Sequence, residues 1–436
     1  MIQASPKTIR KNLNIAIKTI SQSSEQYVRH PDRDFTRKRK LPFESMLKLL
    51  VSMGGNTLCK ELHDWFEYSQ DTATTSAFIQ QREKVLPSAL EDLFHLFVSK
   101  SRCVERYRGY RLLAVDGSDL RMPANASDPV SYFKNDAEDA KGYNLIHLDA
   151  MYDLLNTVYV DASLQAKRMT SEHRALVEMV ERSNIHDKVI LTADRGYESY
   201  NNMAHIAEKG WYFVIRAKES FGIITKTDIP PSTEFDTRTT ITLTRRQTKY
   251  TRQLMRLNPS RYRWLPPHAT FDYLSPKDDK MYDLQLRIVR FLLPSGKPET
   301  IYTNLPDEDF SCESIRKIYR MRWGIETSFR ALKYTIGLAN FHSKKPLFIV
   351  QEVFARLTFF NFCKMISSVV ERSLSEKYHT NFSLAVMLCR RFLRKQLHEC
   401  ILMGEISRLI LPIRPNRAFV RYQAHTYAVG FGYRVQ

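Results

Sequence analysis

The sequence lacks any cysteine pattern that predicts a disulfide framework or a zinc site. None of its six cysteines forms a Cys-x-x-Cys pair or has the spacing of zinc ligands. His398 lies near Cys400, but no second pair of ligands accompanies them, so we interpret both as structural. The cysteines are Cys59, Cys103, Cys312, Cys363, Cys389 and Cys400. Unpatterned cysteines fit a reducing compartment, and we expect a cytoplasmic protein.

Long uninterrupted apolar runs are also missing. No apolar signal core follows Met1, so nothing predicts export. The most apolar stretch, residues 347–370, contains polar side chains that argue against a membrane span. These side chains are Gln351, Glu352, Arg356, Asn361 and Lys364. The sequence has no internal repeat or low-complexity segment, and we expect no membrane partner.

Basic residues are in large excess. The 436-residue chain has 66 lysines and arginines against 47 acidic residues, a net charge of +19. This surplus favours a polyanionic partner, although a merely basic soluble protein would share it. Residues 245–249 form a compact basic cluster, and residues 261–264 alternate arginine with aromatics. Cations interleaved with aromatics suit phosphate contact and base stacking, although each cluster alone could be a solvated face.

Two short apolar runs each end in an aspartate. Residues 111–115 precede Asp116, residues 188–193 precede Asp194, and a glycine follows each aspartate within two positions. Such runs predict buried strands, and open α/β sheets bind ligands at the carboxyl ends of their strands. Either aspartate alone could be a turn former or a helix N-cap. Together they favour a carboxylate site.

A helix predicted from Ser311 to about Tyr334 carries four polar residues on one face. Tyr319, Arg322, Glu326 and Lys333 fall within a sector of roughly 60° at helical periodicity. A carboxylate between two cations and a phenol is poor core material. The pattern suits a site that holds a metal beside a phosphate, although a solvated face with ion pairs would look similar.

These elements resemble the DDE transposases of bacterial insertion sequences, in the insertion-sequence-four (YREK) group. That group's signature is tyrosine, two residues, arginine, three residues, glutamate, six residues and lysine. The helix matches every position, with Tyr319, Arg322, Glu326 and Lys333. The first two acids of the family triad map onto Asp116 and Asp194, whose Asp-Arg-Gly-Tyr context is also typical. The resemblance covers about residues 105–345.

The resemblance implies a two-metal active site. Asp116, Asp194 and Glu326 would be the catalytic and metal-binding residues, with Asp116 bridging. Two divalent ions can activate the nucleophile and stabilise the leaving oxygen of a displacement at phosphorus. Three carboxylates without histidine suit Mg²⁺, and we expect Mn²⁺ to substitute. His147 and His173 are interpreted as structural, because this chemistry takes its base from metal-bound water.

The same resemblance implies DNA contacts. Arg322 and Lys333 would hold phosphates, and Tyr319 would donate its hydroxyl to the DNA backbone. Arg195, in the Asp-Arg-Gly-Tyr context, is a further DNA-binding candidate. Trp264 would stack on a base flipped near the cut, although a core tryptophan of a small β domain is an open alternative.

We expect an α/β protein with an RNase H-like catalytic core, a β-rich insertion domain, and helical N- and C-terminal regions. The separation of Asp194 and Glu326 is too long for a minimal core of this kind. Thr239–Thr244 alternates like a strand within the intervening segment. The predicted domains are 1–105 (helical, binding DNA ends), 106–219 with 300–344 (core), 220–299 (insertion) and 345–436 (helical, for dimerisation or DNA contacts).

The predicted function is a cut-and-paste DNA transposase that excises and joins an insertion sequence. Its partners would be the terminal inverted repeats of the element and target DNA, with a homodimer in the synaptic complex. Two alternatives stay open: a nuclease of the same fold without strand transfer, and a domesticated, catalytically silent DNA-binding protein. The intact acids and signature argue against a silent protein.

Overall fold

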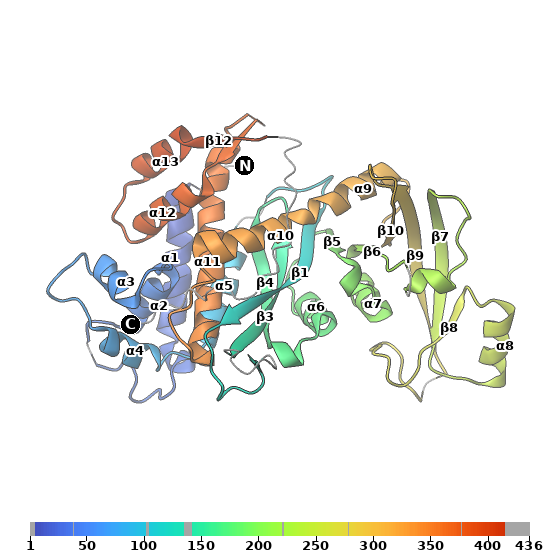
Figure 1. The fold of residues 1–436 in the computed structure, drawn as a ribbon, viewed down its shortest axis with the longest axis horizontal. Helices are drawn as coiled ribbons and strands as arrows, with labels where there is room; N and C mark the ends of the chain where they lie inside the picture. The colour runs from blue at the N-terminus through green and yellow to red at the C-terminus, as the bar shows by residue number, and fades with distance from the viewer. Residues whose placement is uncertain are drawn as a thin grey trace.

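The structure, a computed structural model, describes residues 5–414 except 38, 102–103, 135–141, 220–221, 278 and 376. The last part of the predicted 345–436 region, from residue 415, lies outside the described residues. Figure 1 shows a helical body built from both ends of the chain, a central sheet beside it, and an extension of that sheet away from the body.

Ten strands of the described chain form one mixed sheet, in the order β2-β3-β1-β5-β6-β10-β9-β7-β8, with β4 also paired to β3. Their bounds are β1 Arg111–Met122, β2 Tyr132–Phe133, β3 Tyr143–Asp153, β4 Val158–Ala166, β5 Val189–Ala193, β6 Tyr212–Arg216, β7 Phe235–Thr244, β8 Tyr262–Trp264, β9 Met281–Leu292 and β10 Pro298–Thr303. β5 runs parallel to β1 and β6, whereas β3 is antiparallel to β1 and β4.

Helices cover both faces of the central strands. Because successive residues of a strand point to opposite faces, β1 contributes to two cores. Leu113 and Val115 share one core with α6 (Glu172–Glu181) and α7 (Tyr200–Glu208). On the other face, Leu112 shares a core with α9 (Cys312–Met321), and Ala114 shares one with α10 (Trp323–Arg330). The face of Ala114 therefore lies under the signature helix.

The two terminal regions pack into one helical body around α11. Its helices are α1 Pro6–Gln22, α2 Phe43–Ser52, α3 Leu58–Trp65, α4 Thr75–Arg82, α5 Ser88–Ser99, α11 Pro346–Glu371, α12 Phe382–Leu393 and α13 Glu399–Arg408. A small sheet of β11 (Tyr378–Thr380) and β12 (Ile410–Pro412) lies beside α12 and α13 in Figure 1.

The central helix of this body, α11, is long and apolar enough to cross a membrane, but 78% of its most apolar window is buried inside the structure. Its polar side chains are buried with partners from other elements. Arg82 of α4 donates to Gln351 and Glu352, and the amide of Asn361 bonds both backbone groups of Tyr159. Matched polar groups of this kind are typical of a helix at the centre of a protein core.

The predicted β-rich segment continues the main sheet. β9 pairs with β10, which pairs with β6, so the sheet runs from the central strands into β9, β7 and β8. The segment also contains the α-helix α8 (Lys249–Leu257), which lies at the far end of the extension in Figure 1. Thr239–Thr244 forms the second half of β7, as its alternation predicts, but its last four residues are all buried, and exposure alternates only over residues 235–238.

Candidate active site

The register of β1 and β5 brings Asp116 and Asp194 next to each other. The parallel ladder pairs Leu113 with Leu191 and Ala114 with Thr192, so both aspartates lie two residues beyond its last pair. Asp194 follows the end of β5, as the sequence predicts. Asp116 is not followed by a turn, because β1 continues to Met122 with β3 as its partner. Asp116 therefore lies where its neighbouring parallel strand ends.

A backbone N–H holds each aspartate. Oδ1 of Asp116 accepts from Gly117 N at 2.9 Å, and Oδ1 of Asp194 accepts from Gly196 N at 2.7 Å. A Cβ on Gly196 would lie 2.9 Å from Asp194 Oδ1, so a side chain there would crowd the carboxylate. The close approach of Asp194 thus explains why the Asp-Arg-Gly-Tyr motif has glycine at position 196.

α10 brings Glu326 to the same place. Asp116 points to the face of Ala114, because the two are separated by one residue in a strand, and this face lies under α10. Arg322 connects the two acids: its guanidinium lies 2.7 Å from Glu326 and 3.8 Å from Asp116. Burial raises the pKa of Asp116 to about 6, with further increases from Asp194 and Glu326, against the opposing effects of the Gly117 N–H and Arg322. Asp194 and Glu326 are therefore both close enough to Asp116 to affect its charge.

The signature helix is not one uniform α-helix. α9 ends at Met321, α10 begins at Trp323, and residues 331–336 form a π-helical turn, η5 (Ala331–Ile336). The wider turn changes the angular step per residue, so a uniform helical wheel does not describe Lys333. Lys333 instead reaches β1, where Nζ donates to Ser118 Oγ at 2.7 Å and to the Asp119 carbonyl at 2.8 Å.

The other predicted DNA-binding residues differ in exposure. Tyr319 is buried beneath Arg322, whose guanidinium lies 5.6 Å from the centre of its ring. Arg195, in the short helix η3 (Arg195–Tyr197), is exposed. Trp264 lies on the outermost strand of the sheet and is 38% exposed, so it is not a core tryptophan. Its indole donates to the Arg245 carbonyl at 3.3 Å.

Sequence reasoning missed a second acidic cluster. His147 and Asp149 on β3 and Glu172 on α6 have ligand-capable atoms within 4.8 Å of one another. The sequence analysis interprets His147 as structural, because the chemistry implied by the resemblance takes its base from metal-bound water. The spacing of His147 and Asp149 is a signal that could have been used, because residues separated by one position on a strand share a face.

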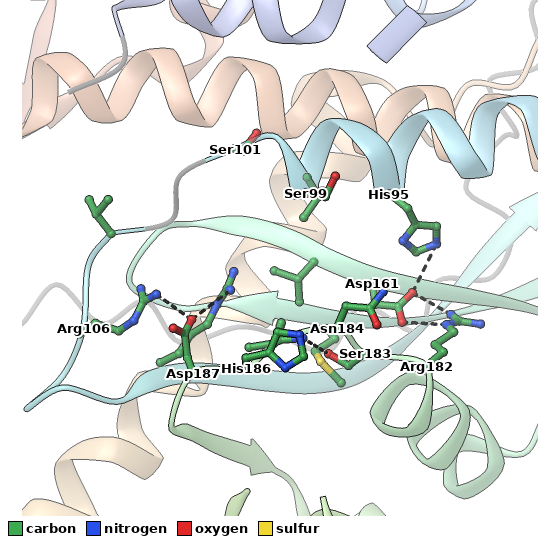
Figure 2. Close-up of a pocket in the computed structure, with 16 residues that line it drawn as sticks. His95, Ser99, Ser101, Arg106, Asp161, Arg182, Ser183, Asn184, His186 and Asp187 are labelled. Carbon is green, nitrogen blue, oxygen red and sulfur yellow. Dashed lines mark hydrogen bonds and ion pairs between the residues drawn. The ribbon is translucent and has the colours of Figure 1, made fainter. Parts of the chain in front are cut away.

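A cavity of about 720 Å³ at the amino end of β1 does not coincide with the predicted site (Figure 2). Its charged residues pair with one another: Arg182 with Asp161, and both Arg106 and Arg111 with Asp187. None of the predicted catalytic or DNA-binding residues lines it. The candidate active site is therefore the cluster of acids beneath α10.

The fold and this cluster define an α/β protein with carboxylates gathered at the end of a parallel strand. The sequence model of the transposase DDE domain matches residues 107–362, more than half of the chain. The chain therefore belongs to the transposase DDE domain family. The match begins just before β1 and ends within α11, so it includes all three acids and the complete signature helix.

Individual relatives are distant. The chain is 35% identical over 57 residues to the putative transposase InsL for insertion sequence element IS186A of Escherichia coli (strain K12). The transposase for insertion sequence element IS421 of Escherichia coli shows the same identity over the same length. Each alignment covers 13% of this chain and 15% of the relative. A cryo-EM structure of the piggyBac transposase synaptic complex with hairpin DNA aligns with a TM-score of 0.43 and 11% identity, covering 97% of this chain and 88% of that one.

Proposed function

We propose that the chain is a cut-and-paste DNA transposase of the insertion-sequence-four (YREK) group. The observation that carries this proposal is the convergence of Asp116, Asp194 and Glu326, with Arg322 between two of them. Membership of the transposase DDE domain family supports it. The catalytic residues are these three acids.

The order of the central strands supports an RNase H-like core. In the sequence β4-β3-β1-β5-β6, the first three strands pair in antiparallel fashion and the last three in parallel. β7, α8, β8 and β9 follow β6 and precede β10 in the chain, as expected for an insertion over residues 220–299. We propose this insertion as a DNA-facing extension of the core, and the helical body (1–105 and 345–436) as the region that binds DNA ends and supports dimerisation.

The donor set of the acid cluster fits magnesium. It offers carboxylate oxygens and no histidine, and two of these oxygens are already held in place by backbone N–H groups. Burial is the main cause of the raised pKa of Asp116, and Asp194 and Glu326 add to it, so a bound cation would favour the charged form of this carboxylate. Asp116, Asp194 and Glu326 would hold Mg²⁺, with Mn²⁺ able to substitute, and the bound metal would activate the attacking oxygen and stabilise the leaving oxygen.

The signature cations have separate tasks. Arg322 holds Glu326 and faces Asp116, and its Nε is buried without a hydrogen-bond partner, so it has capacity for a phosphate oxygen. Lys333 bonds two neutral oxygens, and burial lowers its pKa. A phosphate beside it would supply the missing negative charge. Tyr319 supports Arg322 from below, and Arg195 is an additional exposed cation for the DNA backbone.

DNA is the partner that this chemistry requires. The net charge of +19 favours it, and affinity should fall steeply as salt increases. We propose that two subunits bind a pair of element ends in the bacterial cytosol, each subunit cutting one end.

The test uses the purified chain and the DNA that flanks its gene. If inverted repeats flank the gene, DNA duplexes that carry these repeats should be nicked and joined in the presence of Mg²⁺ but not in the presence of EDTA. Asp194→Ala should bind the ends but neither cut nor join. Cutting without joining would favour a nuclease, and end binding without cutting by the unmodified chain would favour a silent DNA-binding protein. One subunit per active complex, measured by sizing, would refute the paired arrangement.

A further inference from the structure

We propose a second metal site, for a divalent transition-metal ion, on the face of β1 and β3 opposite Asp116. Its ligands are His147 Nε2, Asp149 Oδ1 and Glu172 Oε1. The inference is independent of the proposed function, because it rests on the contacts of these three side chains. The first two come from β3 and the third from the first residue of α6.

The sheet separates His147 and Asp149 from Asp116, whereas Glu172 lies near Gly196, just beyond the end of β5. Gly117 pairs with Asp149, and Asp119 pairs with His147, in the antiparallel ladder of β1 and β3. Directly paired residues share a face, and neighbours along a strand do not. Gly117 and Asp149 therefore point toward α6, whereas Asp116 points toward α10. His147 and Asp149 therefore lie across β1 from Asp116.

The distances suit one shared ion. His147 Nε2 lies 3.4 Å from Asp149 Oδ1 and 3.3 Å from Glu172 Oε1. His147 is 4% exposed and Asp149 is fully buried, yet Nε2 and Oδ1 have no hydrogen-bond partner. Buried polar atoms without a partner are rare and costly, and here both face the same point. A cation at that point would satisfy them together.

Outer contacts fix each buried ligand and leave one atom free. His147 Nδ1 lies 2.6 Å from Asp119 Oδ1, which orients the ring and directs Nε2 into the cluster. Lys167 holds Asp119 in turn, at 2.8 Å. Gln165 donates to Oδ2 of Asp149 at 2.8 Å, so Oδ1 stays available. A carboxylate behind the histidine is the usual support of a protein metal ligand.

Gly117 keeps the space at the cluster open. A Cβ at this position would lie 2.3 Å from His147 Nε2 and 2.9 Å from Glu172 Oε1. Any other residue would therefore fill the point where the three ligands meet.

One imidazole nitrogen and two carboxylate oxygens favour a transition-metal ion over Mg²⁺. Imidazole nitrogen with carboxylate oxygens suits Zn²⁺ and its first-row neighbours, whereas Mg²⁺ prefers oxygen alone. Three protein ligands leave a fourth position for water, as in open zinc sites. An ion here would link β3 to α6 beside Gly117, the neighbour of Asp116 on β1.

The competing arrangement has a proton in place of the metal. Burial opposes protonation of His147, but its interactions with Asp149, Glu172 and Asp119 raise its pKa to about 10. An imidazolium could therefore neutralise the cluster without an ion. This arrangement and the metal site predict different metal contents, so one measurement separates them.

The experiment measures zinc retained by the full-length, untagged chain after loading with Zn²⁺ and desalting. We expect about one equivalent in the unmodified chain, resistant to excess Mg²⁺, and a rise in the thermal unfolding midpoint that EDTA reverses. His147→Gln and Glu172→Gln should lose the zinc. Glu172 is partly exposed, so its variant keeps the test decisive if His147→Gln does not fold. Asp119→Asn should weaken binding by roughly 10- to 100-fold, because it removes the support of a ligand.

His205→Gln is the matched control. His205 is also buried between two carboxylates, but both ring nitrogens already have partners, with Glu181 at 2.7 Å and Asp272 at 2.8 Å. Its variant should retain zinc, as should Asp116→Asn on the other face. The proposal is overturned if the unmodified chain retains no zinc, if both ligand variants retain it, or if His205→Gln loses it equally.

Discussion

Carboxylates are buried in two parts of this molecule, and their pKa values are shifted in opposite directions. In the helical body, burial raises the pKa of Glu352, but Arg82, His342 and Arg356 lower it to about 2. On β1, beside the end of β5, burial and two neighbouring acids raise the pKa of Asp116 to about 6. The surroundings of Glu352 therefore favour its anionic form, whereas the surroundings of Asp116 disfavour its anionic form.

The difference lies in the balance of charge around each group. Glu352 receives hydrogen bonds from Arg82 and from the backbone of His342, and Arg356 lies nearby. Beneath α10, by contrast, Arg322 pairs with Glu326 and Asp116, and Asp194 is a further acid that raises the pKa of Asp116. The helical network is complete within the folded chain. Charge supplied from outside would favour the anionic form of the acid cluster, as expected if the proposed site binds a metal ion and DNA.

The largest effect is expected from neutralising an acid of the cluster. Asp194→Asn keeps the size of the side chain but should lower the rate of DNA cleavage by at least about 10³-fold, the upper range for losing one electrostatic stabiliser of a transition state. Its free energy of unfolding should stay equal or increase, because a repulsive charge is removed. Cleavage assays and urea unfolding on one preparation check both parts. Normal cleavage with reduced stability would mean that Asp194 is structural.

The opposite outcome is expected for the balanced network. Glu352→Gln leaves Arg82 and Arg356 buried without their anion and should lower the free energy of unfolding by about 3–5 kcal/mol. The control is Glu83→Gln, which breaks the surface pair with Lys345 and should cost about 1 kcal/mol or less. Equal effects in the two variants would remove the distinction between the buried and exposed pairs.

The same network predicts a pH dependence. The pKa of Glu352 is lowered from 4.5 to about 2 in the folded chain, so its stabilising effect is complete above pH 4.5 and is lost as the pH falls toward 2. The stability difference between the unmodified chain and Glu352→Gln should shrink across that interval. Urea unfolding at a series of pH values measures it, and a constant difference would contradict the assignment.

The sequence predicted local features well and long-range partners poorly. The runs before Asp116 and Asp194 folded as buried strands, because their apolar content and the residues after them are local signals. The sequence could not show which residues satisfy the polar groups of α11, because Arg82 and Tyr159 lie far away in the chain. The cluster at His147 was missed for the same reason, because Glu172 comes from another element.

A smaller effect is expected from the signature cations. Arg322→Ala and Lys333→Ala should each weaken the active-site DNA complex by about 1.5–3 kcal/mol, roughly 10- to 100-fold, if each donates to a phosphate. Lys333→Ala should leave stability nearly unchanged. Lys209→Ala is the matched control, because Lys209 also donates to a carbonyl but lies on α7's side of the sheet. If both site variants cleave DNA at the wild-type rate at all salt concentrations, the helix face of Arg322 and Lys333 is ordinary solvent-exposed surface.

The smallest effect concerns Trp264, far from the acids along the sheet. β8 lies six strands from β1, roughly 29 Å at the usual strand spacing. Only a partner that spans this distance could connect the two, and a DNA duplex is long enough. Trp264→Ala should therefore cost about 1–3 kcal/mol, the contribution of one stacked base, and should impair cleavage more than end binding. Tyr250→Ala is the control, since Tyr250 is an exposed aromatic of the same segment, on α8. If both variants cleave like the unmodified chain, the extension does not stack on the base near the cut, and the chemistry depends on the balance of charge beneath α10 alone.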